Sequence, residues 1–485
     1  MTHEKSLEAA NSLYEYITSH EDVVHTEVGA ISKSTTQSLF QGKGPENIAE
    51  VDENGVWCRI YSNGSADYRY TTSLDVDNLE NIADKAIRAA KHLGQDYPER
   101  IIPDVVHQAT HNGWTPHNNG SNIIGKIGSI VKNEINDIPH DRFRIRYRNE
   151  SITNDILSST GSTVHTETDR YALSIQITLE EQFTLRNHVA STNGSDILRC
   201  IEEGFCEIRQ RANRIKPAPT TDLDSLPIDP MVLLSPAAAA QVFHKFIHLL
   251  EMDMVFIGAS NLSIGDKVGT DELSIEDCVH AGTWSSLAYD AEATPTTPVE
   301  LIRQGKVVNH LHSVSSAVEE DRAPSGHLIP GLSFEKAPQI HSRHLEIMPS
   351  NMPIDHLREA ADVYIERFGR IRHTDEFTRR MRSSEIPGGI LYAKDIGEHA
   401  EPASSKVERK HRVTCPVEEA YIIQDRDEKS VFEDAEMTIA IKDLKNIEGI
   451  GKHCYTLSGN CMKFGTYVPY EVSSPAVLMS GISFD

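Results

Sequence analysis

The chain has 485 residues, with 47 Lys and Arg against 72 Asp and Glu, so its formal net charge at pH 7 is −25. This excess of carboxylates argues against a protein that binds the phosphates of nucleic acid. An apolar content of 39% with 25% charged residues excludes a mainly disordered chain and suits a globular protein of two or three domains.

Membrane insertion and secretion are not expected from the hydropathy pattern. No stretch approaches the roughly 18 consecutive apolar residues of a membrane span. The first residues lack the basic-then-apolar order of a signal peptide, so we expect a cytoplasmic protein without membrane contacts. The seven cysteines include no CxxC pair, which argues against a disulfide framework.

The first half of the chain alternates between helical and strand patterns. Apolar residues recur every three or four positions over 77–93 and 197–212, which predicts two amphipathic helices. Apolar and polar residues alternate over 143–147 and 173–179, which is typical of half-buried strands. The first part is therefore predicted to be mixed α and β.

A proline-rich segment at 216–230 has the composition of a linker between domains. We place a boundary there, with one domain at 1–225 and a second at 226–485. Beyond the linker the sequence favours short strands, including a hairpin that turns at Gly305. The second domain is therefore predicted to be rich in β structure.

One long helix is predicted at the start of the second domain, over 236–251, with Ser235 as its N-cap. His244 and His248 are four residues apart and share a helical face, which Glu251 extends. Two imidazoles one turn apart can share a divalent ion with a third ligand from elsewhere. A packed or solvated histidine pair remains the alternative. The HExxH protease pattern is absent, because Lys245 follows His244.

Several segments resemble the TldD/PmbA family, also called modulators of DNA gyrase. They are 55–60, the sequence Asp-Ala-Glu-Ala-Thr-Pro at 290–295 with the hairpin after it, 419–423 and 444–451. The resemblance covers nearly the whole chain. It implies an α+β fold of two domains, a mixed α/β N-terminal domain and a β-rich C-terminal domain, and a homodimer or a heterodimer with a sister subunit.

The resemblance also implies a choice between two types of subunit. TldD-type members are zinc-dependent peptidases of unfolded peptides, in which a helical HExxxH motif supplies two ligands and a glutamate base, and a cysteine near the C-terminus completes the site. PmbA-type sisters, also called TldE, lack this motif and act as partners.

The sequence departs from the HExxxH motif. Aligning 250–253 with the family's LEGD places His248 on the second histidine but His244 on the glutamate. A one-residue deletion instead aligns His244 with the first histidine and Lys245 with the glutamate. Either alignment removes the base. Cys461 matches the family's cysteine, so the resemblance implies zinc ligands at His244, His248 and Cys461, with a buried inert cysteine as the alternative.

The segment 338–344 resembles the family's PMPRMTN sequence near the substrate channel, with His341 and His344 at its arginine and asparagine positions. We take His341, Arg343 and His344 as candidate substrate contacts. Glu251, His341 and His344 are candidates for catalytic proton transfer, and one of the two histidines is a candidate for a further ligand. A solvated strand is the competing interpretation.

Two functions remain open. The first is a divergent zinc metallopeptidase or amide hydrolase that acts on short or unfolded peptides or a peptide-like small molecule. Here zinc would lower the pKa of water towards about 7, and one of the candidate residues would accept its proton. The second is a non-catalytic partner subunit of a TldD/TldE-type protease. A hydrolase that uses another first-row metal is a third alternative.

Overall fold

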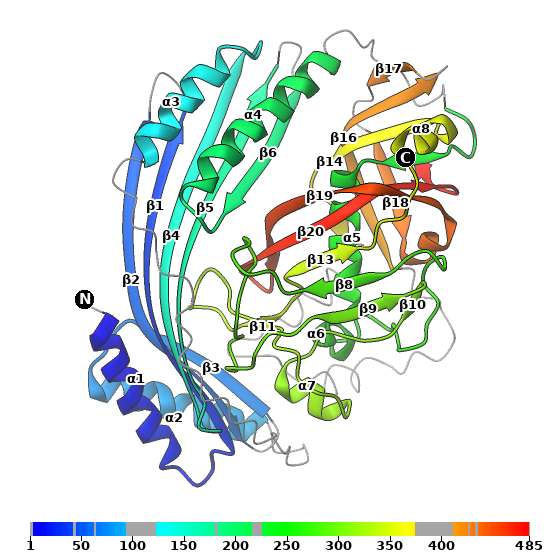
Figure 1. Ribbon diagram of the computed structural model, residues 1–485. Helices are drawn as coiled ribbons and strands as arrows, with labels where there is room; N and C mark the ends of the chain where they lie inside the picture. The colour runs from blue at the N-terminus through cyan, green and yellow to red at the C-terminus, as the bar shows by residue number, and fades with distance from the viewer. Residues whose placement is uncertain are drawn as a thin grey trace. The chain divides into compact units, whose positions relative to one another are not determined.

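The chain folds into two compact units, which we describe separately (Figure 1). The first unit comprises Met1–Pro217, His280–Pro295 and Pro330–Ala337, and the second comprises the remaining segments. Residues 216–225, which include the predicted domain boundary, lie outside the described residues. The computed structural model describes residues 3–41, 45–62, 65–93, 123–179, 183–215, 226–373, 411–424, 427–431 and 435–484.

The first unit is built on a six-stranded sheet in the order β3-β2-β1-β4-β5-β6, in which all neighbours are antiparallel. The alternating segments predicted as strands lie in β4 and β5, which confirms both predictions. The strands are β1 (His25–Phe40), β2 (Pro45–Ser62), β3 (Ser65–Thr71), β4 (Arg142–Ser158), β5 (Thr163–Thr178) and β6 (Thr184–Ser191).

Among the described residues, four helices cover one face of this sheet: α1 (His3–Thr18), α2 (Val76–Leu93), α3 (Ile123–Ile135) and α4 (Asp196–Ile215). Figure 1 shows α1 and α2 at one end of the strands and α3 and α4 at the other. The apolar side chains of α1 and α2 pack against alternate residues of β1 and β2. The two predicted amphipathic helices correspond to α2 and α4 and are confirmed.

The opposite face of the sheet is polar for much of its length. The end of this face nearest β3 is covered by His280–Pro295 and Pro330–Ala337, the two later segments of the first unit. There Trp57, Tyr68, Ala293 and Phe334 form a buried cluster, and the Tyr68 hydroxyl donates to the carbonyl of Phe334. The segment at 290–295 therefore has a packing role in this unit.

The second unit is dominated by a 13-stranded sheet, in agreement with the predicted β-rich domain. Its central order is β10-β9-β8-β13-β20-β7-β14-β16-β18-β21, and β13–β20 and β14–β7 are parallel pairs. The strands are β7 (Val232–Leu234), β8 (Ile275–Cys278), β9 (Val299–Arg303), β10 (Lys306–Val307), β13 (His344–Ile347), β14 (Val363–Phe368), β15 (Arg372–His373), β16 (Arg412–Gln424), β17 (Asp427–Val431), β18 (Glu436–Ala440), β19 (Ile447–Lys463), β20 (Thr466–Met479) and β21 (Ser483–Phe484).

Helix α5 (Pro236–Ile247) lies against β20, β19 and β14 and brings its polar side chains to this sheet. A separate two-stranded sheet pairs β11 (Leu328–Ile329) with β12 (Gln339–Ile340). Among the described residues, none of the helices has the length and apolarity needed to cross a membrane. The other helical elements are η4 (His248–Leu250), α6 (Met252–Phe256), α7 (Val314–Glu319), α8 (Ile354–Ala360) and η5 (Ile441–Asn446).

Candidate metal centre

The start of α5 is fixed by a cap. Ser235 Oγ accepts a hydrogen bond from the backbone N–H of Ala238 at 3.0 Å and donates to the carbonyl of Glu366 at 2.7 Å. Pro236 occupies the first helical position, where a missing N–H costs nothing. The cap predicted from the sequence is confirmed, and its second bond ties the helix to β14.

The predicted end of this helix at residue 251 was wrong. Helix α5 ends at Ile247, a 3₁₀ turn follows, and Glu251 is extended with φ −89° and ψ 124°. The backbone on either side of Glu251 pairs with Leu311, through Leu311 N–H to Leu250 O at 2.9 Å and Met252 N–H to Leu311 O at 3.1 Å. These strand-like bonds replace the helical ones, a tertiary effect that helical spacing does not reveal.

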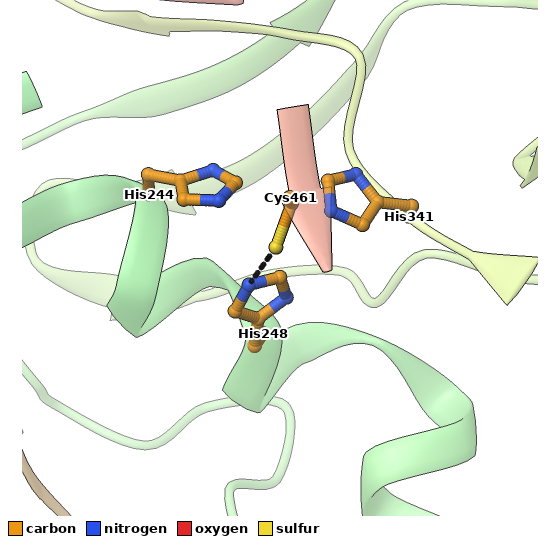
Figure 2. A group of neighbouring side chains, drawn as sticks. All are labelled: His244, His248, His341 and Cys461. Carbon is orange, nitrogen blue, oxygen red and sulfur yellow. Dashed lines mark hydrogen bonds between the residues drawn. The ribbon is translucent and has the colours of Figure 1, made fainter. Parts of the chain in front are cut away.

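Four side chains converge beside the end of α5 (Figure 2). His244, His248, His341 and Cys461 are all buried, and each offers a donor atom that lies within 4.8 Å of the other three. The ring centroid of His248 lies 4.9 Å from that of His244 and 5.2 Å from that of His341. The structure thus brings together the three predicted ligands and His341, one of the two histidines that were candidates for a further ligand.

Separate elements supply these residues. His244 comes from α5, His248 begins the 3₁₀ turn, and His341 directly follows β12. Cys461 lies on β19 opposite Val468 of β20. Because strand residues alternate between faces, Cys461 and Lys463 are both buried while Met462 between them is 48% exposed.

Hydrogen bonds at Nδ1 assign the tautomers of two of these rings. His248 Nδ1 donates to Glu251 Oε2 at 2.8 Å, and His341 Nδ1 donates to the carbonyl of Ser342 at 2.5 Å. In the neutral form of each ring, Nε2 therefore carries the lone pair. His248 Nε2 lies 3.4 Å from Cys461 Sγ, and His341 Nε2 is buried without a hydrogen-bond partner among the described residues.

His244 stacks on Tyr470, with ring centroids 3.6 Å apart and an angle of 13° between the planes. Burial lowers the pKa of His244 to about 3, although the nearby Cys461 opposes this. The ring is therefore neutral at physiological pH. Within the described part of the chain, neither of its buried ring nitrogens has a hydrogen-bond partner, which costs free energy unless something binds there.

Cys461 lies in an electropositive setting. Burial raises the pKa of its thiol, but Lys245, with Nζ 3.8 Å from Sγ, and His248 hold it well below its usual value. Burial lowers the pKa of His248, but Glu251 and Cys461 outweigh it and raise that pKa to about 9. A thiolate is the form of cysteine that binds metals, and a metal would compete with this proton on His248.

This donor set fits a zinc ion. Imidazole nitrogens and a thiolate are the ligands that zinc prefers in proteins. The carboxylate behind His248 is the usual outer partner of a ligating histidine, because it orients the ring and raises its basicity. The unpartnered nitrogens of His244 and His341 are polar atoms that such an ion would satisfy.

A buried cation holds this carboxylate. Lys463 Nζ lies 2.8 Å from Glu251 Oε2, 2.6 Å from Asp253 Oδ2 and 2.6 Å from the carbonyl oxygen of Ile340. Burial lowers the pKa of Lys463, but Asp253 and Glu251 raise it above its usual value. Burial raises the pKa of Glu251, but His248 and Lys463 outweigh this effect and lower the pKa below its usual value, so this carboxyl stays ionised.

The remaining predicted site residues, Glu251, Arg343 and His344, lie outside the four-residue group and have partners of their own. The other oxygen of Glu251 accepts from the Ser342 N–H at 3.3 Å. Arg343 lies 3.6 Å from Asp277, and His344 Nε2 lies 3.0 Å from Ser473 Oγ. Neither Arg343 nor His344 belongs to the four-residue group. Of the candidate substrate contacts, only His341 reaches it.

Three neighbours of the site were not identified from the sequence. His373 of β15 places its ring centroid 5.9 Å from that of His248. Tyr470 and Lys463 are the others. The alternation along β19 could have identified Lys463, since it lies two residues after Cys461 and therefore on the same face. Nothing in the sequence around His373 points to the site.

Comparisons with known proteins identify the family of this chain. The profile of the PmbA/TldA metallopeptidase C-terminal domain matches residues 230–485, which make up more than half of the chain. Two curated relatives are 22% identical: a metalloprotease of Methanocaldococcus jannaschii, over 90% of this chain and 91% of its own length, and one of Methanothermobacter thermautotrophicus, over 94% of each.

Solved structures share the fold over nearly the whole chain. A protein described as a modulator of DNA gyrase from Bacteroides thetaiotaomicron matches with a TM-score of 0.71 at 12% identity, covering 99% of this chain and 98% of that one. TldE from Thermococcus kodakarensis matches with a TM-score of 0.68 at 11% identity, covering 98% and 99%. The match of the C-terminal domain profile to more than half of the chain establishes that the chain belongs to the TldD/PmbA family of metallopeptidases, whose fold these structures share.

Proposed function

We propose that the chain is a zinc-dependent peptidase or amide hydrolase that acts on short or unfolded peptides or a peptide-like small molecule. The observation that supports this most strongly is the convergence of three imidazoles and one thiolate, all buried, within 4.8 Å of one another. Ring nitrogens of His244 and His341 are buried there without hydrogen-bond partners among the described residues. Binding a metal ion is the role that best accounts for them, because a buried polar atom without a partner costs free energy.

We assign His244, His248 and Cys461 as the ligands. A hydrolytic zinc site has three protein ligands and one open position, and zinc there lowers the pKa of water towards about 7 and polarises a carbonyl. Glu251 orients His248 through Nδ1, and Lys463 in turn fixes Glu251. Since both oxygens of Glu251 are occupied, its proposed role is positioning and not proton transfer.

We assign the proton-accepting role to His341. Its Nδ1 is held by the carbonyl of Ser342, which leaves Nε2 in the cluster as the basic atom. A base so placed contributes on the order of 10²–10⁴-fold to the rate. His344 and Arg343 remain candidates for substrate binding only, through the segment that carries His341.

A second candidate function is a non-catalytic partner of a TldD-like subunit. The four-residue group contains no carboxylate, and the family resemblance places either His244 or Lys245 at the position of the glutamate base. If His341 also binds the metal, four protein ligands close the site, as in structural zinc centres. Homodimer or heterodimer formation and a cytoplasmic location stay predictions under either function.

Metal analysis of the purified chain tests the ligand set. We expect about one zinc per chain in the wild type, lost in His248→Ala and in Cys461→Ala. Cys415→Ala is the matched control, because Cys415 is buried in the same unit but outside the cluster. A metal-free wild type, or zinc retained in both variants, would contradict the proposal. A different first-row metal at the same stoichiometry would correct the identity of the ion alone.

The variant His341→Gln separates the two functions. In the hydrolase it keeps zinc and loses cleavage of an unfolded fluorescent casein by about 10²-fold or more. In the closed centre it loses zinc affinity, and the wild type shows no chelator-sensitive cleavage. Co-purification with a second family member that carries an intact HExxxH motif would then support the partner function.

A further inference from the structure

A row of arginines runs along β4 on the face of the six-stranded sheet opposite its four helices. Arg142, Arg144, Arg146 and Arg148 alternate with Phe143, Ile145 and Tyr147, so the arginines share one face and the apolar residues face the helices. Arg144 pairs with Gln176 of β5, and Gln176 pairs with Arg186 of β6, which brings a further exposed arginine to the same face.

The positive charge of this row is only partly neutralised within the first unit. Arg148 forms an ion pair with Glu150 at 2.5 Å, and Lys33 contacts the same carboxylate at 2.8 Å. Arg142 Nε lies 3.4 Å from Thr178 Oγ1. Arg144 and Arg146 are exposed, and no carboxylate among the described residues pairs with either of them.

The residues that pair with these two arginines across the strands are uncharged. Across the strands, Arg146 lies between Leu39 and Ser174, and Arg144 lies beside Gln176. In a chain with a net charge of −25, exposed arginines have many carboxylates available as neighbours. A patch that keeps its positive charge is therefore a specific local feature.

The row also borders a hollow of about 450 Å³ in the same unit. Two guanidinium groups and the side-chain amide of Gln176 line it. Guanidinium presents its N–H donors in a planar fork that matches a carboxylate with two parallel hydrogen bonds. The complete described lining is Gln41, Arg142, Phe143, Arg144, Gln176 and Thr178.

We propose that this face binds an extended acidic peptide segment. Alternate residues along an extended strand are about 6.8 Å apart, both in β4 and in a peptide lying along it. Carboxylates at every second position of such a peptide therefore match the repeat of Arg142, Arg144 and Arg146. This binding site goes beyond the proposed hydrolase and uses none of the residues assigned to the metal.

Charge also favours a short acidic peptide over nucleic acid. A chain with a net charge of −25 repels a long polyanion, whereas a peptide brings only a few carboxylates to the local patch. Proteins that bind single strands stack the bases on several aromatic side chains. Phe143 is the one aromatic residue in the described lining of the hollow.

Fluorescence anisotropy with a labelled peptide of alternating Glu and Ser tests this site at low salt. We expect saturable binding that weakens as salt is added, with none for the matched peptide of alternating Gln and Ser. Arg144→Gln with Arg146→Gln should raise Kd about five- to thirtyfold, from up to about 1 kcal/mol for each exposed pair. Both side chains are exposed, so the fold should tolerate the change.

The matched control is Arg88→Gln with Arg199→Gln, which changes the net charge equally but removes exposed arginines of α2 and α4. It should bind the acidic peptide like the wild type. His248→Ala should do so as well, so failure of the metal proposal and failure of this one are distinguishable. Equal binding of the Gln peptide, an unchanged Kd in the row variant, or tighter binding of a single-stranded oligonucleotide would overturn the proposal.

Discussion

Replacing Lys463 by Met tests how the residues around the candidate metal site are stabilised. The ammonium group is buried and lies within 2.8 Å of Glu251 Oε2, of both oxygens of Asp253, and within 2.6 Å of the carbonyl of Ile340. Met has a similar volume but no charge. Lys463→Met therefore removes the cation and leaves two carboxylates facing each other without access to water.

The expected loss of stability is large. Removing one partner of a buried ion pair typically costs about 3–5 kcal/mol, because the other charge stays buried and uncompensated. A loss of that size lowers Tm by on the order of 10 °C. Burial and Glu251 already raise the pKa of Asp253, whereas Lys463 lowers it. Without the lysine, Asp253 should take up a proton, which limits the loss.

Denaturant unfolding followed by circular dichroism measures this effect, with Lys452→Met as the control, since Lys452 lies exposed on the same strand. Adding Asp253→Asn to Lys463→Met should recover part of the loss, because it removes one of the two opposed charges. A Lys463→Met protein within about 0.5 kcal/mol of the wild type would refute the reasoning. So would a double variant less stable than Lys463→Met alone.

Three further predictions concern the site and the first unit. Glu251→Gln should weaken zinc binding about 10–100-fold in a chelator competition, because an amide accepts more weakly from the ring that it orients; unchanged affinity would contradict the positioning role. Gly29→Ala should lower the free energy of unfolding by about 1–3 kcal/mol, since its Cβ would lie 2.2 Å from Trp57 Cε2; in Gly128→Ala the nearest atom is at 3.5 Å, so this helical change should be neutral or stabilising. Burial lowers the pKa of His188 to about 4, so between pH 6.5 and 4 the unfolded chain binds a proton that the folded chain does not. The free energy of unfolding measured in urea should therefore decrease as the pH is lowered through that window. His188→Gln should make this free energy less dependent on pH, and an NMR titration midpoint of His188 near 6.5 would contradict the prediction.

Local periodicity was enough to predict much of the first unit. Helix α2 and strands β4 and β5 follow directly from spacings of three to four and of two residues, because each buries one face against a single partner layer. The cap at Ser235 was equally readable, since it depends on three neighbouring residues. These features are local in the sequence.

The candidate metal site could be predicted only in part. The pair His244 and His248 follows from helical spacing, and Cys461 entered through the family resemblance. The end of α5 could not be read, because its last turn is replaced by pairing with Leu311, which is distant in the sequence. His341 was a candidate for substrate contact, for proton transfer and for a further ligand, but its position beside His248 depends on the path of the chain after β12, which no local pattern encodes.

The separation of the ligands along the chain has a consequence for biosynthesis. His248 and Cys461 are 213 residues apart, so the cysteine leaves the ribosome long after the histidine pair. Before Cys461 is synthesised, only the three imidazoles of the group are available to an ion. The elements that carry them are not yet packed against the hairpin of β19 and β20. Metal binding by the complete ligand set would therefore follow the synthesis of β19. It would link α5 to β19, as a cross-link that closes a very long loop does.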